Sequence, residues 1–176
     1  MEDLRSSLVA PCVTTTLMIF GLLHSMQEYV KIKYKAIDDN GKSLLPHPYE
    51  PWIKDTTLDK KYLPLVDKAY RAFRMFENVK EWTFLSIPIM FIFHIYGSNL
   101  PYISDEKRMF NIMDYVTIGS GMFYLYATNL FIKGYIESAN LRLKGFKLRR
   151  RLCEFWLFGT IISLLWFVIE KYYILA

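Results

Sequence analysis

Four long apolar runs alternate with polar, charged segments along this chain. The runs cover residues 8–26, 82–97, 110–136 and 155–169, and the last continues to residue 176. About 20 residues of helix cross the hydrocarbon core of a bilayer, and the second run reaches that length once its polar helical prefix is included. The pattern therefore predicts an all-α integral membrane protein, a single domain over residues 1–176 built as a four-transmembrane-helix bundle.

The four runs are not equally apolar, which indicates their places in the bundle. Asp114 and several small residues interrupt the third run, and the second run follows a charged stretch. We expect these two helices to line the inside of the bundle, and the first and fourth to lie nearer lipid. The alternative is a soluble helical domain with unusually apolar helices.

Lysine and arginine gather in two of the connections, and this asymmetry predicts the orientation. The chain has 22 Lys and Arg against 17 Asp and Glu, a net charge of +5. Most of these cations fall within residues 31–80 and 133–151, so both segments are expected to lie in the cytosol. The two termini and the turn at 98–108 are then expected on the lumenal side. Anionic lipid explains the positive charge without a nucleic-acid partner.

Residues 36–64 differ in composition from the runs around them. They hold four of the seven prolines, together with an Asp-Asp-Asn-Gly turn signal. Prolines at 46, 48 and 51 exclude a continuous helix there. The segment is expected to be a long cytosolic loop, and its role is left open as functional, disordered or an insertion.

Polar side chains form a stripe directly before the second apolar run. The spacings of three, four and three residues place them within about 80° on one helix face. A polar stripe at the mouth of a membrane helix is costly unless it faces protein, water or ligand, so it marks a candidate site. Its members are Arg71, Arg74, Asn78 and Glu81.

A second stripe is predicted at the end of the third run, with spacings of four and three residues. Its members are Tyr124, Thr128, Phe131, Tyr135, Ser138 and Arg142. If the two stripes face one another, they offer guanidinium groups, a hydroxyl, an amide and a carboxylate, a set suited to a zwitterion with more than one carboxylate. The structural alternative is that the arginines extend to lipid headgroups while Asn78 and Glu81 pair between helices.

Both stripes resemble motifs of one known family. Residues 71–85 (RAFRMFENVKEWTFL) resemble the Arg-x-x-Arg-x-x-x-Asn-x-x-Glu signature of the membrane-associated proteins in eicosanoid and glutathione metabolism. Residues 134–148 (GYIESANLRLKGFKL) resemble the third-helix motif of the branch that contains leukotriene-C4 synthase and microsomal glutathione S-transferases.

The resemblance implies a homotrimer in the membrane of the endoplasmic reticulum or nuclear envelope. It implies a transferase of leukotriene biosynthesis or related lipid metabolism, with glutathione as co-substrate and a lipophilic electrophile or fatty-acid derivative as its second substrate. Arg142 is implied as the catalytic residue that stabilises the thiolate. The implied glutathione-binding residues are Arg71, Arg74, Asn78, Glu81 and Tyr135, with Lys31 and Lys33 as looser matches.

Two departures from the family pattern keep a second function open. Thr128 and Phe131 stand where the best-matched members have an arginine and a tyrosine, so a charge and a hydroxyl are missing. The alternative is a non-enzymatic lipid-binding scaffold similar to the lipoxygenase-activating protein. His24 and His94 have no second histidine or cysteine at ligand spacing, so no metal is expected and hydrogen bonding between helices is the expected use of both.

Overall fold

Four long helices form the structure, a computed structural model that describes residues 2–37, 39–41, 44, 60–98, 111–137, 139–170 and 172. They are α1 (Glu2–Lys35), α2 (Leu63–Ser98), α3 (Ile112–Ile136) and α4 (Ala139–Ile169), with a short 3-10 turn η1 (Lys60–Tyr62) before α2. Every regular element in these ranges is helical, so the predicted all-α class is confirmed.

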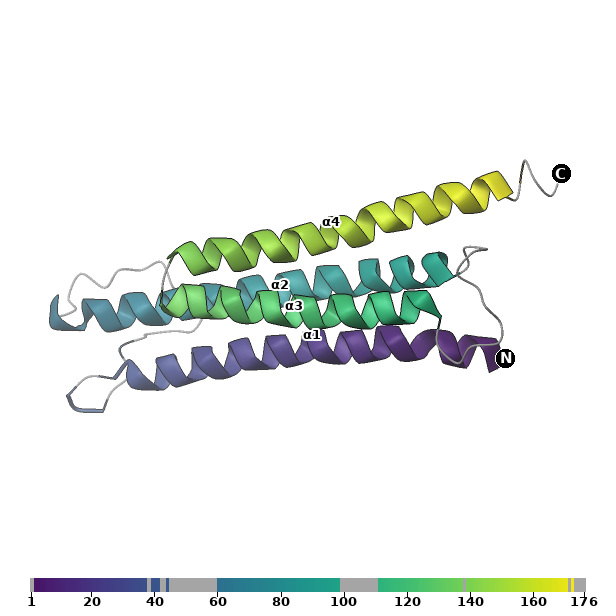
Figure 1. Ribbon diagram of the computed structural model, residues 1–176. Coiled ribbons are helices and arrows are strands. Elements are labelled where there is room, and N and C mark those ends of the chain that lie inside the picture. Colours follow the sequence, from purple (N-terminus) through teal and green to yellow (C-terminus); the bar gives the residue numbers. More distant parts are fainter. Residues whose placement is uncertain are drawn as a thin grey trace.

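Helices α2 and α3 lie between α1 and α4 (Figure 1). Each of the two outer helices packs against both inner ones, and among the described residues α1 and α4 do not contact each other. The outer helices carry more than half of the exposed large apolar side chains, such as Phe20 on α1 and Phe158 on α4. The packing order matches the predicted inner position of the second and third helices, and the nearness of α1 and α4 to lipid stays a prediction.

Two helices are long and apolar enough to cross a membrane within the described part of the chain. They are α1 over Leu8–Lys35 and α4 over Arg142–Ile169. The N-terminal end of α1 and the C-terminal end of α4 lie at the same end of the bundle (Figure 1). A span by each of α2 and α3 stays a prediction.

Within the predicted loop at 36–64, the structure describes residues 36–37, 39–41, 44 and 60–64. Asp39 and Asn40 form a turn, and Gly41 has a φ of 77°, the left-handed conformation that glycine adopts without strain. The amide of Leu44 donates to the carbonyl of Ala36 at 2.9 Å, which closes this turn. Leu63 and Pro64 belong to α2, so the helix begins inside the predicted loop. Residues 38, 42–43 and 45–59 lie outside the described residues, as does the predicted turn from residue 99 onward.

The fourth helix begins earlier than the sequence predicts. The basic segment 142–151, expected as part of a connection, forms the first third of α4. Helix α3 ends at Ile136, where the amide of Glu137 donates to the carbonyl of Lys133 at 2.7 Å. A residue on α4 can lie close to the end of α3 because only residues 137–138 separate the two helices.

Two apolar clusters hold the helices together. One contains Met18, Met90, Phe93, Tyr124 and Trp156 and joins all four helices. The other lies toward the end where α3 finishes and contains the buried residues Met75, Val79, Phe131 and Ile132. Tyr135 packs against the second cluster, so a predicted site residue rests directly on the core.

Candidate functional site

The predicted stripe on α2 lies on one helix, but its members differ in burial. Asn78 is half-buried, while Arg71, Arg74 and Glu81 are exposed. The amide nitrogen of Asn78 donates to the carbonyl of Arg74 at 2.8 Å and to the hydroxyl of Tyr135 at 3.2 Å. Asn78 is therefore the member of the stripe that joins α2 to α3.

The predicted stripe on the third helix is wrong in its continuity. It assumed one helix from Tyr124 to Arg142, but the chain leaves α3 at Ile136 and Arg142 belongs to α4. Ser138 lies outside the described residues. The guanidinium carbon of Arg142 nevertheless lies 5.1 Å from the ring centre of Tyr135, a cation–π distance. The structure thus brings together Asn78, Tyr135 and Arg142 from three different helices.

Aromatic rings continue this contact toward the interior. The rings of Tyr135 and Phe131 meet edge to face, with 4.9 Å between their centres. Trp82 on α2 meets Phe146 on α4 in the same way, at 5.6 Å. Phe131, which stands at a position of departure from the family pattern, is thus part of a cluster of aromatic rings behind the polar contact.

Thr128, the other departure, has a packing role. Its side chain is fully buried, and its hydroxyl has no hydrogen-bond partner among the described residues. Its methyl group lies 3.2 Å from the place that a Cβ at Gly21 would occupy, so Thr128 packs against α1. Thr128 therefore contributes to the contact between α3 and α1.

Arg149 belongs to the same region, although the sequence predicts it as part of a solvated basic connection. Its side chain is 1% exposed, and its guanidinium carbon lies 4.0 Å from the ring centre of Phe131 and 6.0 Å from that of Trp82. The available signal was helical spacing, because Gly145, Arg149, Leu152 and Trp156 follow intervals of four, three and four and are all buried. Among the nearby cations, Arg149 falls on this inward row, whereas Arg150 and Arg151 are exposed.

The looser matches on α1 lie elsewhere. Lys31 forms an ion pair with Glu28 at 2.6 Å. It also lines a cavity of about 230 Å³ between the ends of α1, α2 and α3, together with Lys35 and Lys68. Lys33 is half-buried and does not line that cavity. That Lys31 or Lys33 binds the same ligand as Asn78, Tyr135 and Arg142 stays a prediction.

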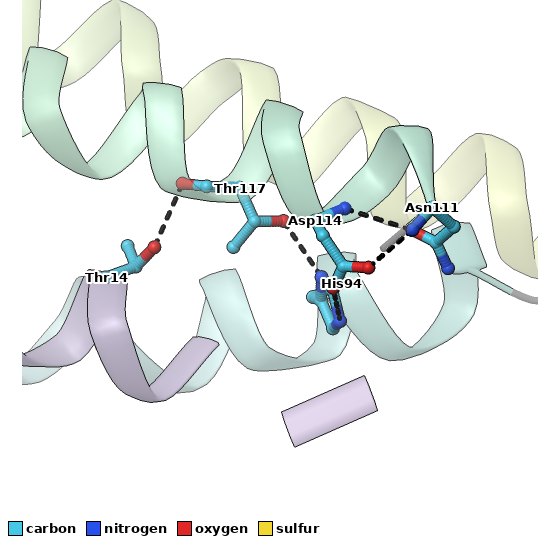
Figure 2. A network of polar contacts seen from close by, with 5 residues as sticks. All are labelled: Thr14, His94, Asn111, Asp114 and Thr117. Atoms are coloured by element: carbon cyan, nitrogen blue, oxygen red, sulfur yellow. Dashed lines mark hydrogen bonds and ion pairs between the residues drawn. The ribbon is translucent and has the colours of Figure 1, made fainter. Parts of the chain in front are cut away.

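The opposite end of the bundle holds a second polar cluster (Figure 2). His94 Nδ1 lies 2.9 Å from the hydroxyl of Thr117, and its Nε2 lies 3.6 Å from a carboxylate oxygen of Asp114. The Thr14 hydroxyl donates to the carbonyl of Thr117 at 3.0 Å. His94 thus bonds between helices, as expected, and α1, α2 and α3 are tied together through one buried polar network.

Asp114 also begins α3 through reciprocal capping bonds. The Asn111 side chain accepts from the Asp114 amide at 3.0 Å, and the Asp114 carboxylate accepts from the Asn111 amide at 2.7 Å. Such a capping box satisfies amide groups that the first turn of a helix leaves without partners. This arrangement explains the interruption of the apolar run by an acidic residue.

Comparisons with known proteins add no relative. Neither the known protein-family models nor the curated protein sequences contain a match to this chain. Among the described residues, no three His, Cys, Asp or Glu side chains group as metal ligands. The interpretation of the site consequently rests on the two sequence motifs and on the contact of Asn78, Tyr135 and Arg142.

Proposed function

We propose that this chain is a membrane-bound glutathione transferase that activates the thiol of glutathione against lipophilic electrophiles. The observation that supports the proposal is the meeting of Asn78, Tyr135 and Arg142, which belong to both resembling motifs. They supply an amide, a hydroxyl and a guanidinium at one place. These groups match the carboxylates and amino group of a zwitterionic peptide.

Arg142 is the proposed catalytic residue. A free thiol has a pKa of about 8.5, so it is mostly protonated at neutral pH, and each unit of depression corresponds to about 1.4 kcal/mol. An arginine stays charged and can donate directional hydrogen bonds to sulfur, so it favours the thiolate. The guanidinium of Arg142 rests on the Tyr135 ring, which limits the positions it can take.

The thiolate then attacks an electrophilic carbon, such as that of an allylic epoxide. A carbon–sulfur bond forms, the carbon–oxygen bond breaks, and the released alkoxide takes up a proton from water. In a peroxidase variant of the reaction, two glutathione thiols are oxidised to a disulfide. The lipid hydroperoxide is reduced to an alcohol and water at the same time.

The proposed assembly is a homotrimer of four-span subunits in the endoplasmic reticulum or nuclear envelope, with both termini in the lumen. Arg71, Arg74 and Glu81 are exposed on α2, and a ligand held between neighbouring subunits is proposed to contact this part of the helix. The exposed apolar side chains of α1 and α4 suit contact with lipid, through which a lipophilic substrate would arrive. The basic ends of α1 and α4 suit a cytosolic position.

The decisive experiment is a glutathione titration of the purified protein in detergent, read by the ultraviolet absorbance of the thiolate. We expect a thiolate signal for the wild type and its loss in Arg142→Ala. Arg151→Ala is the matched control because Arg151 is an exposed cation on the same helix. Absence of glutathione binding to the wild type would refute the proposed function.

The same titration separates an enzyme from a lipid-binding scaffold similar to the lipoxygenase-activating protein. The scaffold is favoured by the loss of a family arginine and tyrosine at Thr128 and Phe131, both of which are buried. Binding of glutathione without any thiolate signal, together with binding of a fatty acid, would support the scaffold. A thiolate signal that depends on Arg142 would exclude it.

A further inference from the structure

Arg149 is a buried cation for which the described part of the chain provides no anionic partner. Its side chain is 1% exposed, and none of its three guanidinium nitrogens has a hydrogen-bond partner there. Arginine remains protonated in proteins and carries five N–H donors. A buried charge without a counter-ion is costly, and such groups are ordinarily paired.

The groups around Arg149 are aromatic or neutral. Its guanidinium lies over the ring of Phe131 at 4.0 Å and near that of Trp82 at 6.0 Å. The titratable groups that act on it most strongly are Tyr124, Tyr135 and Cys153, all uncharged in their ordinary forms at neutral pH. Ring faces attract a cation but do not replace the directional acceptors that five N–H groups require. The missing component is an anionic group.

Arg149 lies near the contact of Asn78, Tyr135 and Arg142 and is linked to it through the ring of Phe131. Phe131, which touches its guanidinium, meets the ring of Tyr135 at 4.9 Å. Arg142 and Arg149 lie seven residues apart on α4, about 10 Å along the helix axis and on nearly the same face. An extended tripeptide spans about the same length. Two guanidinium groups at this spacing suit two anionic groups of one extended tripeptide.

We propose that Arg149 is an interior binding residue, which receives an anionic group of the tripeptide whose thiol lies at Arg142. This inference rests on the proposed function, and the anionic group is a carboxylate, since the thiolate is assigned to Arg142. The ligand reaches Arg149 by displacing a neighbouring ring. Trp82 suits this role because it is half-buried and lies near both the Arg149 guanidinium and Phe146.

The test compares Arg149→Met with Arg149→Lys and with the control Arg151→Met. Glutathione binding to each purified protein in detergent is measured by calorimetry, and the melting temperature is measured without ligand. We expect Arg149→Met to weaken binding at least tenfold, about 1.4 kcal/mol, and Arg149→Lys to restore part of the affinity. Arg151→Met should bind as the wild type does.

The melting temperature distinguishes a binding residue from a structural clamp between α2, α3 and α4. If Arg149 pairs with an anion only when the ligand is bound, replacing its charge by an apolar side chain leaves the ligand-free melting temperature unchanged or raises it. A fall of several degrees in Arg149→Met, restored by Arg149→Lys, would overturn the inference. Equal glutathione affinity of Arg149→Met and the wild type would also overturn it, while leaving the proposed function intact.

Two glutathione derivatives identify the anionic group. S-methylglutathione keeps both carboxylates but cannot form a thiolate, and glutathione monoethyl ester lacks the glycyl carboxylate. An effect of Arg149→Met that disappears with the S-methyl derivative would place the thiolate at Arg149 and overturn both this inference and the role proposed for Arg142. An effect that disappears with the ester assigns the glycyl carboxylate. If no variant and no wild-type protein binds any of the three probes, the proposed function itself fails.

Discussion

At the end of the bundle where α2 finishes and α3 begins, buried polar side chains meet one another. His94, Thr117 and Thr14 are linked by hydrogen bonds, and Asp114 lies against His94 while it caps α3. At the opposite end, where α3 finishes and α4 begins, Arg149 is equally buried but lies among rings without an acceptor. Polar groups that pair with their neighbours stabilise a fold, whereas a buried cation without a counter-ion is costly and is a candidate for binding an anion.

The largest effect is expected for the polar cluster of Thr14, His94, Asp114 and Thr117, and it tests whether this cluster stabilises the fold. Asp114→Ala removes the capping bond that the Asp114 carboxylate accepts and a buried neighbour of His94, so we expect the free energy of unfolding to fall by about 2–4 kcal/mol. A denaturant titration of the purified protein in detergent measures it. Asp67→Ala, an exposed carboxylate on α2, should change stability by less than about 0.5 kcal/mol. Equal effects of the two variants would contradict a structural role of the network.

A second prediction concerns the close approach of α3 and α4 near the end where α3 finishes and α4 begins. A Cβ placed on Gly145 would overlap the backbone nitrogen of Phe131 and would lie 2.8 Å from the carbonyl oxygen of Ala127. Backbone atoms cannot rotate away, so Gly145→Ala should push α4 outward and cost about 1–3 kcal/mol. The displacement should also weaken glutathione binding, because Arg142 and Arg149 both move with α4.

Gly119→Ala is the matched control for this effect, since nothing lies within 4 Å of its added Cβ. Alanine is the better helix former, so this variant should gain about 0.5–1 kcal/mol. Unfolding of both variants under the same denaturant gives the comparison. Destabilisation of Gly119→Ala as large as that of Gly145→Ala would show that helix contact is not the cause.

The sequence predicts most of the helices and part of the site. It does not predict the end of α3 at Ile136 or the burial of Arg149. Apolar runs predicted the helices, and the spacing of Arg74, Asn78 and Glu81 placed them on one face of α2, because both depend on local periodicity. The break after Ile136 was missed because Tyr135, Ser138 and Arg142 keep helical spacing across it. Periodicity alone does not reveal where a helix ends when the same pattern continues beyond the end.

Arg149 is the second feature that the sequence does not predict. Its neighbours along the chain are cations, and a cluster of cations predicts a solvated segment. The groups that bury it, Phe131 and Trp82, come from other helices, far away in the sequence. Its place on the row with Gly145 and Trp156 is visible in the sequence, but only the packing of α2 and α3 against that row gives the position its meaning.

A smaller effect on stability is expected for the hydrogen bond between Asn78 and Tyr135, which lies near the end where α3 finishes. Hydrogen bonds between helices in membrane proteins contribute about 0.6 kcal/mol on average, so Asn78→Ala should reduce stability by about that amount. Tyr135→Phe removes only the hydroxyl and should lose no more. Both variants should bind glutathione more weakly, measured by calorimetry. A large loss of stability without loss of binding would place this pair with the structural network instead.

The smallest effect on stability is expected for the exposed ion pair of Asp39 and Lys61. It tests whether burial determines how strongly a charged group affects stability. Lys61 Nζ lies 2.5 Å from an Asp39 carboxylate oxygen, and both side chains are more than half exposed. The hydrogen bond from Lys61, and then that involving Tyr62, lowers the pKa of Asp39 below its ordinary value of 3.8. Because the folded pKa is depressed, the contribution is complete above pH 3.8 and is lost as pH falls through the folded pKa.

Asp39→Asn should therefore leave the melting temperature at pH 7 nearly unchanged, since water screens an exposed pair. Any small difference from the wild type should vanish at low pH, where Asp39 is protonated, and in 1 M salt, where the screening length is about 3 Å. Melting curves across pH and salt give the measurement. If Asp39→Asn destabilised the protein as much as Asp114→Ala does, burial could not explain why a carboxylate stabilises one end of the bundle, and the same reasoning about Arg149 would lose its basis.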